Sequence, residues 1–178
     1  SPDYLECLFT EALSDPEVKI LSIATRPDCL GSDILELLAR LAKIKPVWVE
    51  LGLQTIHEDT DAFIRRGYSL NVFYQSVMNL HDIGNSITGH TILALPGESE
   101  THMLETIRYL NSLPIQGIKL QLLHLLQDTD LSSYYDAHPF WIPTPEEYLD
   151  LLGKCLSSLR PDIVVHRLTG DGPKTLLL

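Results

Sequence analysis

Cysteine is scarce in this sequence of 178 residues, which contains only Cys7, Cys29 and Cys155. The gaps between them are too wide and too irregular for a zinc motif or a disulfide framework. We therefore interpret each first as a small buried hydrophobic residue. A chain without disulfides is typical of a reducing compartment, so we expect a cytoplasmic location.

Long hydrophobic runs are absent as well. No apolar run approaches the roughly 20 residues that cross a membrane, and no basic, apolar leader with a small-residue cleavage site is present. We expect neither export nor a membrane partner. The first residues, SPDYLECLF, have the pattern of the middle of a helix. We therefore expect this chain to be a piece of a longer protein.

Basic residues are few, with 13 lysines and arginines against 24 acidic residues and a formal net charge of -11. This balance argues against a broad basic face for nucleic-acid phosphates, although it leaves room for a local pocket. Hydrophobic residues make up 44% of the chain. That proportion is enough for one core, and we expect residues 1–178 to form a single domain.

Apolar segments rich in strand-forming residues alternate with helical patterns along most of the chain. Strands are expected at 18–26, 47–54, 86–95, 117–126 and 162–168, and helices at 32–43, 55–67, 70–83, 99–113 and 144–159. This alternation predicts parallel strands joined by right-handed helical crossovers. The irregular stretch 127–143 carries several aromatic residues and is expected to form a lid or wall of a site.

The two faces of the predicted strands differ in character. In segment 47–54 the valines and leucines share one face, and Trp48, Glu50, Gly52 and Gln54 share the other. His90, Lys119 and Gln121 extend the polar face on later strands. A parallel sheet covered by helices on both sides would be apolar on both faces. The pattern therefore favours a full or partial barrel whose polar lumen holds a large ligand.

Histidines near strand ends leave other functions open. His90, His124 and His166 could surround one mouth of a barrel, which would suit a metal-dependent hydrolase, although no His-x-His pair occurs. A domain that only binds a nucleotide or a partner is a further alternative. No nucleophile elbow, Walker loop or dinucleotide fingerprint is present to decide among them.

Six segments together resemble the radical S-adenosylmethionine superfamily. Within it, they resemble the bacterial branch of uncharacterised Fe–S oxidoreductases whose core is similar to the elongator catalytic subunit. The segments are SIATRPDCL (22–30), VWVELGLQT (47–55), IRRGYS (64–69), HTILALPGE (90–98), GIKLQLLHLLQDTDL (117–131) and VVHRLTGDGP (164–173). The resemblance implies an α/β fold, a partial parallel (β/α) barrel of TIM-barrel type that lacks the N-terminal βα units.

The resemblance also implies cofactors. Members of the superfamily hold a [4Fe–4S] cluster through CxxxCxxC, and reductive cleavage of S-adenosylmethionine gives a 5′-deoxyadenosyl radical that abstracts hydrogen from a substrate. No CxxxCxxC occurs in this sequence. We therefore expect the cluster site upstream in a longer, oxygen-sensitive protein with an electron donor, and we expect this chain alone to be inactive.

By the same resemblance, particular residues are expected at the S-adenosylmethionine site. Gln54 and Arg66 match residues that contact the ribose and the methionine carboxylate, and His90 stands where relatives have an acid. The full set of expected cofactor contacts is Arg26, Glu50, Gln54, Arg66, His90, Pro96 and Gly97. Weaker expectations for substrate contacts are His124, His166, Arg167 and Asp171.

The resemblance leaves the substrate open, because relatives near the elongator branch act on RNA or on small metabolites. Missing barrel units should also expose the edge of the first strand. We therefore expect a homodimer, or a tendency to aggregate, through that edge.

Overall fold

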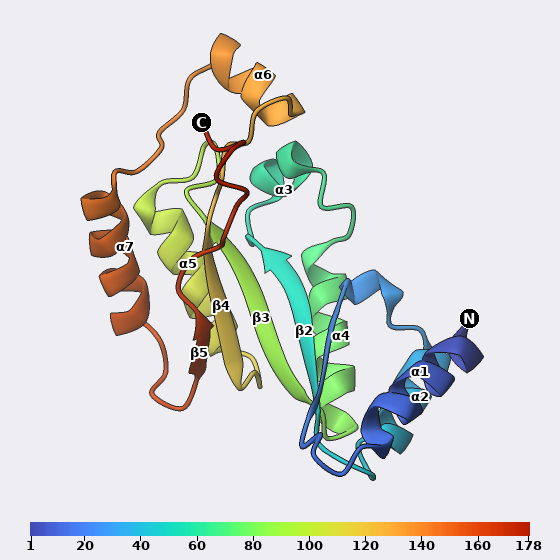
Figure 1. Cartoon of the computed structure of the whole chain (residues 1–178). Helices are drawn as coiled ribbons and strands as arrows, with labels where there is room; N and C mark the ends of the chain where they lie inside the picture. Colours follow the sequence, from blue (N-terminus) through green and yellow to red (C-terminus); the bar gives the residue numbers. More distant parts are fainter.

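One parallel sheet runs through the computed structural model, which describes residues 1–178 (Figure 1). Its five strands lie in the order β1-β2-β3-β4-β5, and every neighbouring pair is parallel. The strands are β1 (Leu21–Thr25), β2 (Val47–Gln54), β3 (Ser86–Leu93), β4 (Gly117–Leu122) and β5 (Val164–Arg167). The predicted α/β class with a parallel sheet is confirmed, and the open order with two edges is consistent with a partial barrel.

Helices connect the strands and cover one side of the sheet. They are α1 (Pro2–Ser14), the 3-10 turn η1 (Pro27–Cys29), α2 (Ser32–Leu41), α3 (Glu58–Ile64), α4 (Leu70–Asp82), α5 (Glu100–Asn111), α6 (Asp130–Ala137) and α7 (Pro145–Ser157). Helix α4 packs on β2 and β3, α5 packs on β3 and α7, and α1 packs on α2 and β1. None of these helices combines the length and the apolar character that a bilayer span requires.

The core lies between the sheet and these helices. Along β2, every second side chain is buried, beginning at Val47 and ending at Leu53, and the side chains between them are partly accessible. Phe73 of α4 and Ile107 of α5 are fully buried against this face. Full burial of one such side chain contributes about 1.5–3 kcal/mol. The predicted division of β2 into an apolar and a polar face is therefore confirmed.

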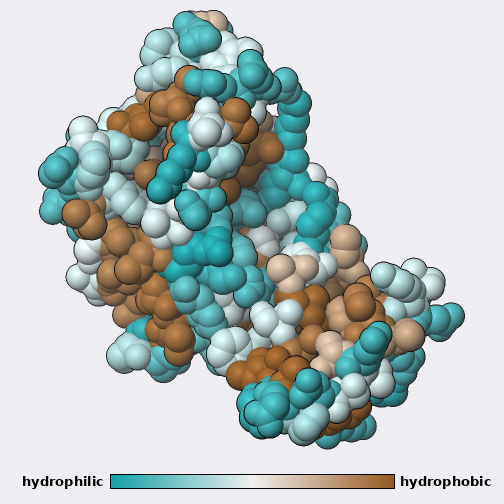
Figure 2. All heavy atoms as spheres, viewed as in Figure 1, coloured by the Kyte–Doolittle hydropathy of each residue, from teal (hydrophilic) through white to brown (hydrophobic).

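The opposite face of the sheet is polar and open. Seen from the same side as Figure 1, Figure 2 shows hydrophilic residues gathered over the middle of the sheet, between hydrophobic residues along its two sides. Helices α3 and α6 lie at the end to which the strands run (Figure 1). The carboxyl ends of the strands, where parallel barrels carry their sites, therefore meet in this region.

Local signals predicted some helix ends correctly and others not. Helix α7 starts at Pro145, close to the predicted start, and Thr144 and Glu147 form its capping box. The helix expected from residue 55 starts later than predicted, because α3 begins at Glu58 with His57 at its N-cap position. The Thr55 hydroxyl donates to the buried Glu98 carboxylate. The irregular stretch 127–143 contains a short helix, α6, that the sequence pattern did not predict.

Candidate functional site

Strained backbone gathers at the carboxyl end of the sheet. Four non-glycine residues have a positive φ: Gln54 at 65°, Arg65 at 55°, Ala94 at 64° and Asp128 at 59°. Gln54 and Ala94 end or follow adjacent strands, and Asp128 lies between β4 and α6. Left-handed backbone costs on the order of 1 kcal/mol for residues of this kind, and such residues concentrate at binding and catalytic sites.

Gln54 is displaced by a bulge at the end of β2. The register with β3 shifts between Gly52 and Gln54, so that Gln54 pairs with Thr91. The amide of Gln54 lies back over Gly52, where an added Cβ would stand 2.8 Å from its Nε2. No hydrogen bond within the protein occupies this half-buried amide. It is therefore free to bind a ligand.

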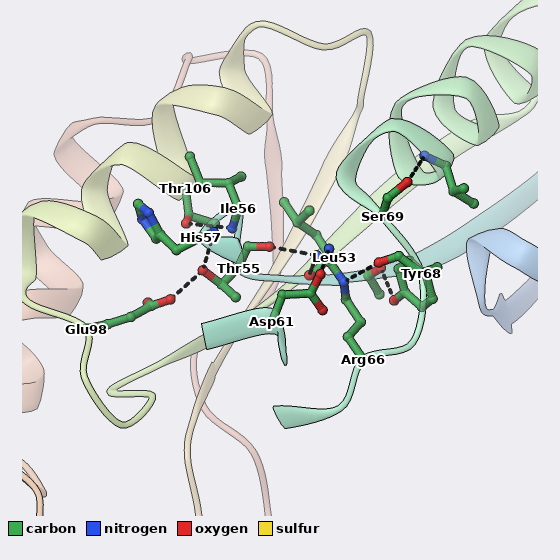
Figure 3. Close-up of polar contacts among 12 residues, drawn as sticks. Leu53, Thr55, Ile56, His57, Asp61, Arg66, Tyr68, Ser69, Glu98 and Thr106 are labelled. Atoms are coloured by element: carbon green, nitrogen blue, oxygen red, sulfur yellow. Dashed lines mark hydrogen bonds and ion pairs between the residues drawn. The ribbon is translucent and has the colours of Figure 1, made fainter. Parts of the chain in front are cut away.

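Arg66 is held in a closed network (Figure 3). Its Nη1 donates to the carbonyl oxygens of Leu53 and Thr55, both at 2.7 Å, and its Nε donates to the Tyr68 carbonyl at 3.1 Å. Its Nη2 lies 2.6 Å from Asp61 Oδ2, and only 3% of the side chain is exposed. The network fixes the end of β2 against the segment after α3, and it leaves little of the guanidinium for a carboxylate ligand.

Tyr68 joins this network to Arg26. Its hydroxyl donates to the Gly52 carbonyl at 2.6 Å, and its ring centre lies 5.2 Å from the Arg26 guanidinium and 4.9 Å from that of Arg66. Burial raises the pKa of Tyr68, an effect that the two arginines partly oppose. Arg26 is half exposed and pairs with Asp28 at 2.7 Å. It therefore lies at the rim of the site.

Three charged or titratable side chains meet on the polar face, in the middle of the sheet. Glu50 Oε2 lies 2.5 Å from Lys119 Nζ and 2.9 Å from His90 Nε2. Ser22 donates to the other carboxylate oxygen at 3.3 Å. Each of the three side chains keeps 13–20% of its surface exposed. This polar cluster is half-buried and can be reached from the open face.

Burial and mutual contact shift the pKa values within the polar cluster. Burial acts to raise the pKa of Glu50, but the hydrogen bond and charge of Lys119, together with His90, bring it below its ordinary value. Burial lowers the pKa of His90, and Glu50 only partly compensates. The cationic Lys119 and Arg167 lower it further. His90 is therefore held neutral beside an ionised Glu50 at neutral pH.

An apolar pocket of about 370 Å³ opens at the carboxyl ends of β3 and β4. Ile92, Leu95, Pro96 and Leu123 form its floor, and Phe63 and Tyr134 close it from α3 and α6 with rings 4.9 Å apart. A neighbouring hollow is lined by Pro96 and Gly97, whose φ of 85° forms the turn after β3. This pocket has the size and the apolar lining that suit a flat heteroaromatic ring.

A second hollow, also of about 370 Å³, lies between β4 and β5. It brings together His124, Arg167 and Asp171, three of the four predicted substrate contacts, with Gln121 beside them. We call it the β4–β5 hollow. His166 is not part of it. Its ring packs 5.1 Å from that of Trp48, near the beginning of β2 on the polar face. The β4–β5 register shift places His166 there.

Sequence reasoning missed several of these residues as site residues. Lys119 was predicted to face the lumen, but its contact with Glu50 was not predicted. A period of two shows which face of the sheet a side chain is on, but not which residue of another strand it contacts. Phe63 and Tyr134 come from segments whose helices were misjudged or not predicted. The one signal in the sequence was the aromatic content of 127–143, which predicted a wall of a site and includes Tyr134.

The cysteines are dispersed and do not form a ligand set. The interpretation as a small buried residue is wrong for Cys7 and Cys29, which are exposed on separate segments. It is confirmed for Cys155, which is buried in α7, where burial raises its pKa to about 11. No group of three or more His, Cys, Asp or Glu side chains is placed to share a metal ion. The residues of this chain therefore do not fit a [4Fe–4S] cluster, and the three strand histidines give no support to a hydrolase metal centre.

Comparison with known proteins places this geometry in a family. The sequence model of the radical SAM superfamily matches residues 2–110, and that of the radical SAM C-terminal domain matches residues 115–178. The uncharacterized protein YtqA of Bacillus subtilis (strain 168) is 39% identical over 170 residues, 96% of this chain and 53% of its own length. The uncharacterized protein MJ0486 of Methanocaldococcus jannaschii is 34% identical over 161 residues, 90% of this chain and 50% of its own.

Solved structures share the fold. The Elp3 of Methanocaldococcus infernus superposes with a TM-score of 0.79 at 21% identity, over 90% of this chain and 38% of that one. Coproporphyrinogen III oxidase (HemN) of Escherichia coli gives a TM-score of 0.66 at 16% identity, over 88% and 36% of the two chains. This chain spans about half the length of the curated relatives it matches. With both family models matched in order across one continuous sheet, the chain belongs to the radical SAM superfamily.

Proposed function

We propose that this chain is the S-adenosylmethionine-binding and substrate-facing part of a radical SAM enzyme, an Fe–S oxidoreductase. The observation that carries the proposal is the apolar pocket at the carboxyl ends of β3 and β4. Gln54, whose amide is free, ends the neighbouring strand β2. When bound, S-adenosylmethionine supplies the 5′-deoxyadenosyl radical in this superfamily, while the protein orients it and excludes water.

The residues present suit the adenosyl part of that cofactor. Ile92, Leu95 and Pro96 offer an apolar surface for the adenine ring. Gln54, which ends the strand next to β3, has an amide that can both donate to and accept from ribose hydroxyls. Arg66, which is engaged with Leu53, Thr55 and Asp61, acts in this proposal by holding the end of β2 in place.

The cluster belongs, in this proposal, to a longer protein that contains this chain. The cysteines here do not converge, and the curated relatives are about twice as long as the matched region. We therefore propose that CxxxCxxC lies in the remaining part, together with the docking surface for an electron donor. This chain alone would bind the adenosyl group of S-adenosylmethionine without catalysing a reaction.

The substrate class is proposed more broadly, as RNA or a small metabolite. One relative, at 23% identity over 161 residues, is the tRNA uridine(34) acetyltransferase of Methanocaldococcus jannaschii. An acidic chain with a net charge of -11 would need basic residues from elsewhere to hold RNA. Self-association through the open edge of β1 is part of the same proposal.

A titration tests the cofactor assignment directly. Calorimetry with S-adenosylmethionine should show one site on this chain, and Gln54→Ala should weaken it about three- to tenfold, since one ligand hydrogen bond is lost. Gln75→Ala is the matched control, because Gln75 is exposed on α4, on the other side of the sheet. It should leave the affinity unchanged.

Two outcomes would count against the proposal. Equal affinity of the wild type and Gln54→Ala would remove Gln54 from the site. No binding by this chain or by the longer protein with its cluster would overturn the function itself. ATP serves as a competitor: if it binds as tightly as S-adenosylmethionine, the site is a general nucleotide pocket.

A further inference from the structure

The arginines of this chain divide into paired and unpaired groups. Most of them contact a carboxylate within 4 Å: Arg26, Arg40, Arg65, Arg66 and Arg160 pair with Asp28, Glu6, Asp130, Asp61 and Asp162. The two exceptions are Arg108 and Arg167. In a chain with almost twice as many acids as bases, an arginine without an acid partner is unusual.

Arg167 stands over the polar face of the sheet. It ends β5 in register with Lys119 and lines the β4–β5 hollow together with Ile92 and Gln121. Its charge reaches His90, whose pKa it helps to lower. Arg108 is exposed, as Arg167 is, but it lies on α5, the helix that covers the other face. Only Arg167 therefore places an unpaired guanidinium within the candidate site.

The neighbouring charges leave Arg167 available. Lys119 is neutralised by Glu50 at 2.5 Å, and His90 also contacts Glu50. Asp171 lines the same hollow, but it lies beyond ion-pair distance from Arg167. A ligand anion would therefore meet a guanidinium whose donors are free, with His124 and Gln121 as additional hydrogen-bonding groups.

The wall of the hollow is built by the end of the chain. An added Cβ at Gly172 would lie 2.8 Å from His124 Nδ1, and one at Gly170 would lie 3.3 Å from its Cε1. Both glycines let the chain pass closely over this ring. Residues 125–127 then pair with the last residues, through Gln127 N to Leu176 O at 2.7 Å and Leu178 N to Leu125 O at 3.0 Å. His124 is thereby fixed beside Arg167.

The hollow adjoins the apolar pocket. Ile92 and Leu123 line both, so a molecule in the hollow would lie next to a molecule in the pocket. The hollow lies at the β5 edge of the sheet, whereas Arg26 follows β1 at the other edge. This position suits the substrate of a reaction that begins at the neighbouring ligand.

We propose that the β4–β5 hollow binds an anionic group of the substrate, a carboxylate or a phosphate, with Arg167 as its cationic partner. The inference rests on the proposed function for the identity of the neighbouring ligand. The hollow selects substrates that carry such a group close to the reacting atom. Arg167 and the fixed His124 orient that group, and Ile92 separates it from the apolar pocket.

Nuclear magnetic resonance of this 20.0 kDa chain tests the proposal with simple probes. Sodium acetate and inorganic phosphate are titrated separately at constant ionic strength into the ¹⁵N-labelled chain. Saturable shifts are expected at the Arg167 Nε–H and the Gly170 amide. The tighter of the two probes identifies the anionic group. Arg167→Gln should weaken binding about tenfold or more, and Arg167→Lys should weaken it less.

Arg108→Gln is the matched control, because Arg108 is the other unpaired arginine. This variant should bind acetate and phosphate with the same affinity as the wild type. Equal, non-saturating shifts at both arginines would overturn the proposal. Competition between S-adenosylmethionine and acetate would also overturn it, since the hollow would then hold the methionine carboxylate. Retained S-adenosylmethionine binding by Arg167→Gln separates the two proposals: loss of acetate binding alone would leave the cofactor site intact.

Discussion

Two charged networks lie within this site, and they differ in what their members can still bind. Around Arg66, the guanidinium meets Asp61 and the carbonyls of Leu53 and Thr55, and only 3% of the arginine side chain is exposed. The polar cluster of Glu50, His90 and Lys119 is also paired, but each side chain keeps 13–20% of its surface open. The first network is closed, and the second faces the open, polar side of the sheet.

The difference shows how one charged residue stabilises a fold while another serves a ligand. A guanidinium that meets several backbone carbonyls fixes the conformation of the segments that carry them. A partly accessible cluster can exchange partners with a bound molecule at smaller cost. Both networks contain residues expected at the cofactor site, yet their geometry assigns Arg66 to positioning and Glu50 with His90 to the accessible face.

The largest expected effect comes from breaking the closed network. Arg66→Met should lower the free energy of unfolding by about 3 kcal/mol, because Asp61 and three backbone carbonyls lose their donor. Urea denaturation measures this change. Arg40→Met is the matched control, because its pair with Glu6 is half exposed and should contribute less than about 1 kcal/mol. Similar losses in both variants would contradict the comparison.

The polar cluster should produce a smaller effect that depends on pH. The folded-state pKa of His90 lies below its ordinary value of 6.5, so below that pH the unfolded chain binds a proton that the folded chain resists. Stability attributable to His90 should therefore fall as the pH drops from 7 to 5, by at most about 1.4 kcal/mol per pH unit. In His90→Gln this contribution should disappear, as urea denaturation at several pH values can measure.

The imidazole titration of His90, followed by nuclear magnetic resonance, checks the cause. Its midpoint should lie below 6.5 in the wild type. Glu50→Gln should lower it further, because Glu50 raises the pKa of His90 through charge and a hydrogen bond. A midpoint above 6.5, or a rise in Glu50→Gln, would show that the cluster is arranged differently.

The smallest effect is expected at an ion pair that belongs to neither network. Arg65 and Asp130 lie 3.2 Å apart with 80% and 88% of their side chains exposed. Arg65→Ala should change the free energy of unfolding by less than about 0.5 kcal/mol, since exposed pairs are screened by water and salt. Thermal unfolding compares it with Arg66→Met. A large loss of stability in Arg65→Ala would mean that this ion pair holds α6 in place, and not the contact of Phe63 with Tyr134.

Much of this architecture was predictable from local pattern. The period of two along residues 47–54 predicted both faces of β2, because alternation in a strand follows from backbone geometry alone. The same argument placed Glu50, His90 and Lys119 on one face. The resemblance suggested His124, Arg167 and Asp171 as substrate contacts without placing them in one hollow, and the structure brings these three together. The cofactor and substrate roles of all these residues stay predictions.

The order of the elements, the apolar face that meets the helices and the polar face that does not all follow from the residue pattern. These depend on side chains a few residues apart, which the sequence displays directly. Long-range contacts settled the rest. Thr55 binds Glu98 and Arg66 is enclosed. His166 packs on Trp48 and does not join the hollow at the strand ends, and Arg167 has no acid partner. Such outcomes depend on bulges, register and loop closure, which bring together residues far apart in the chain.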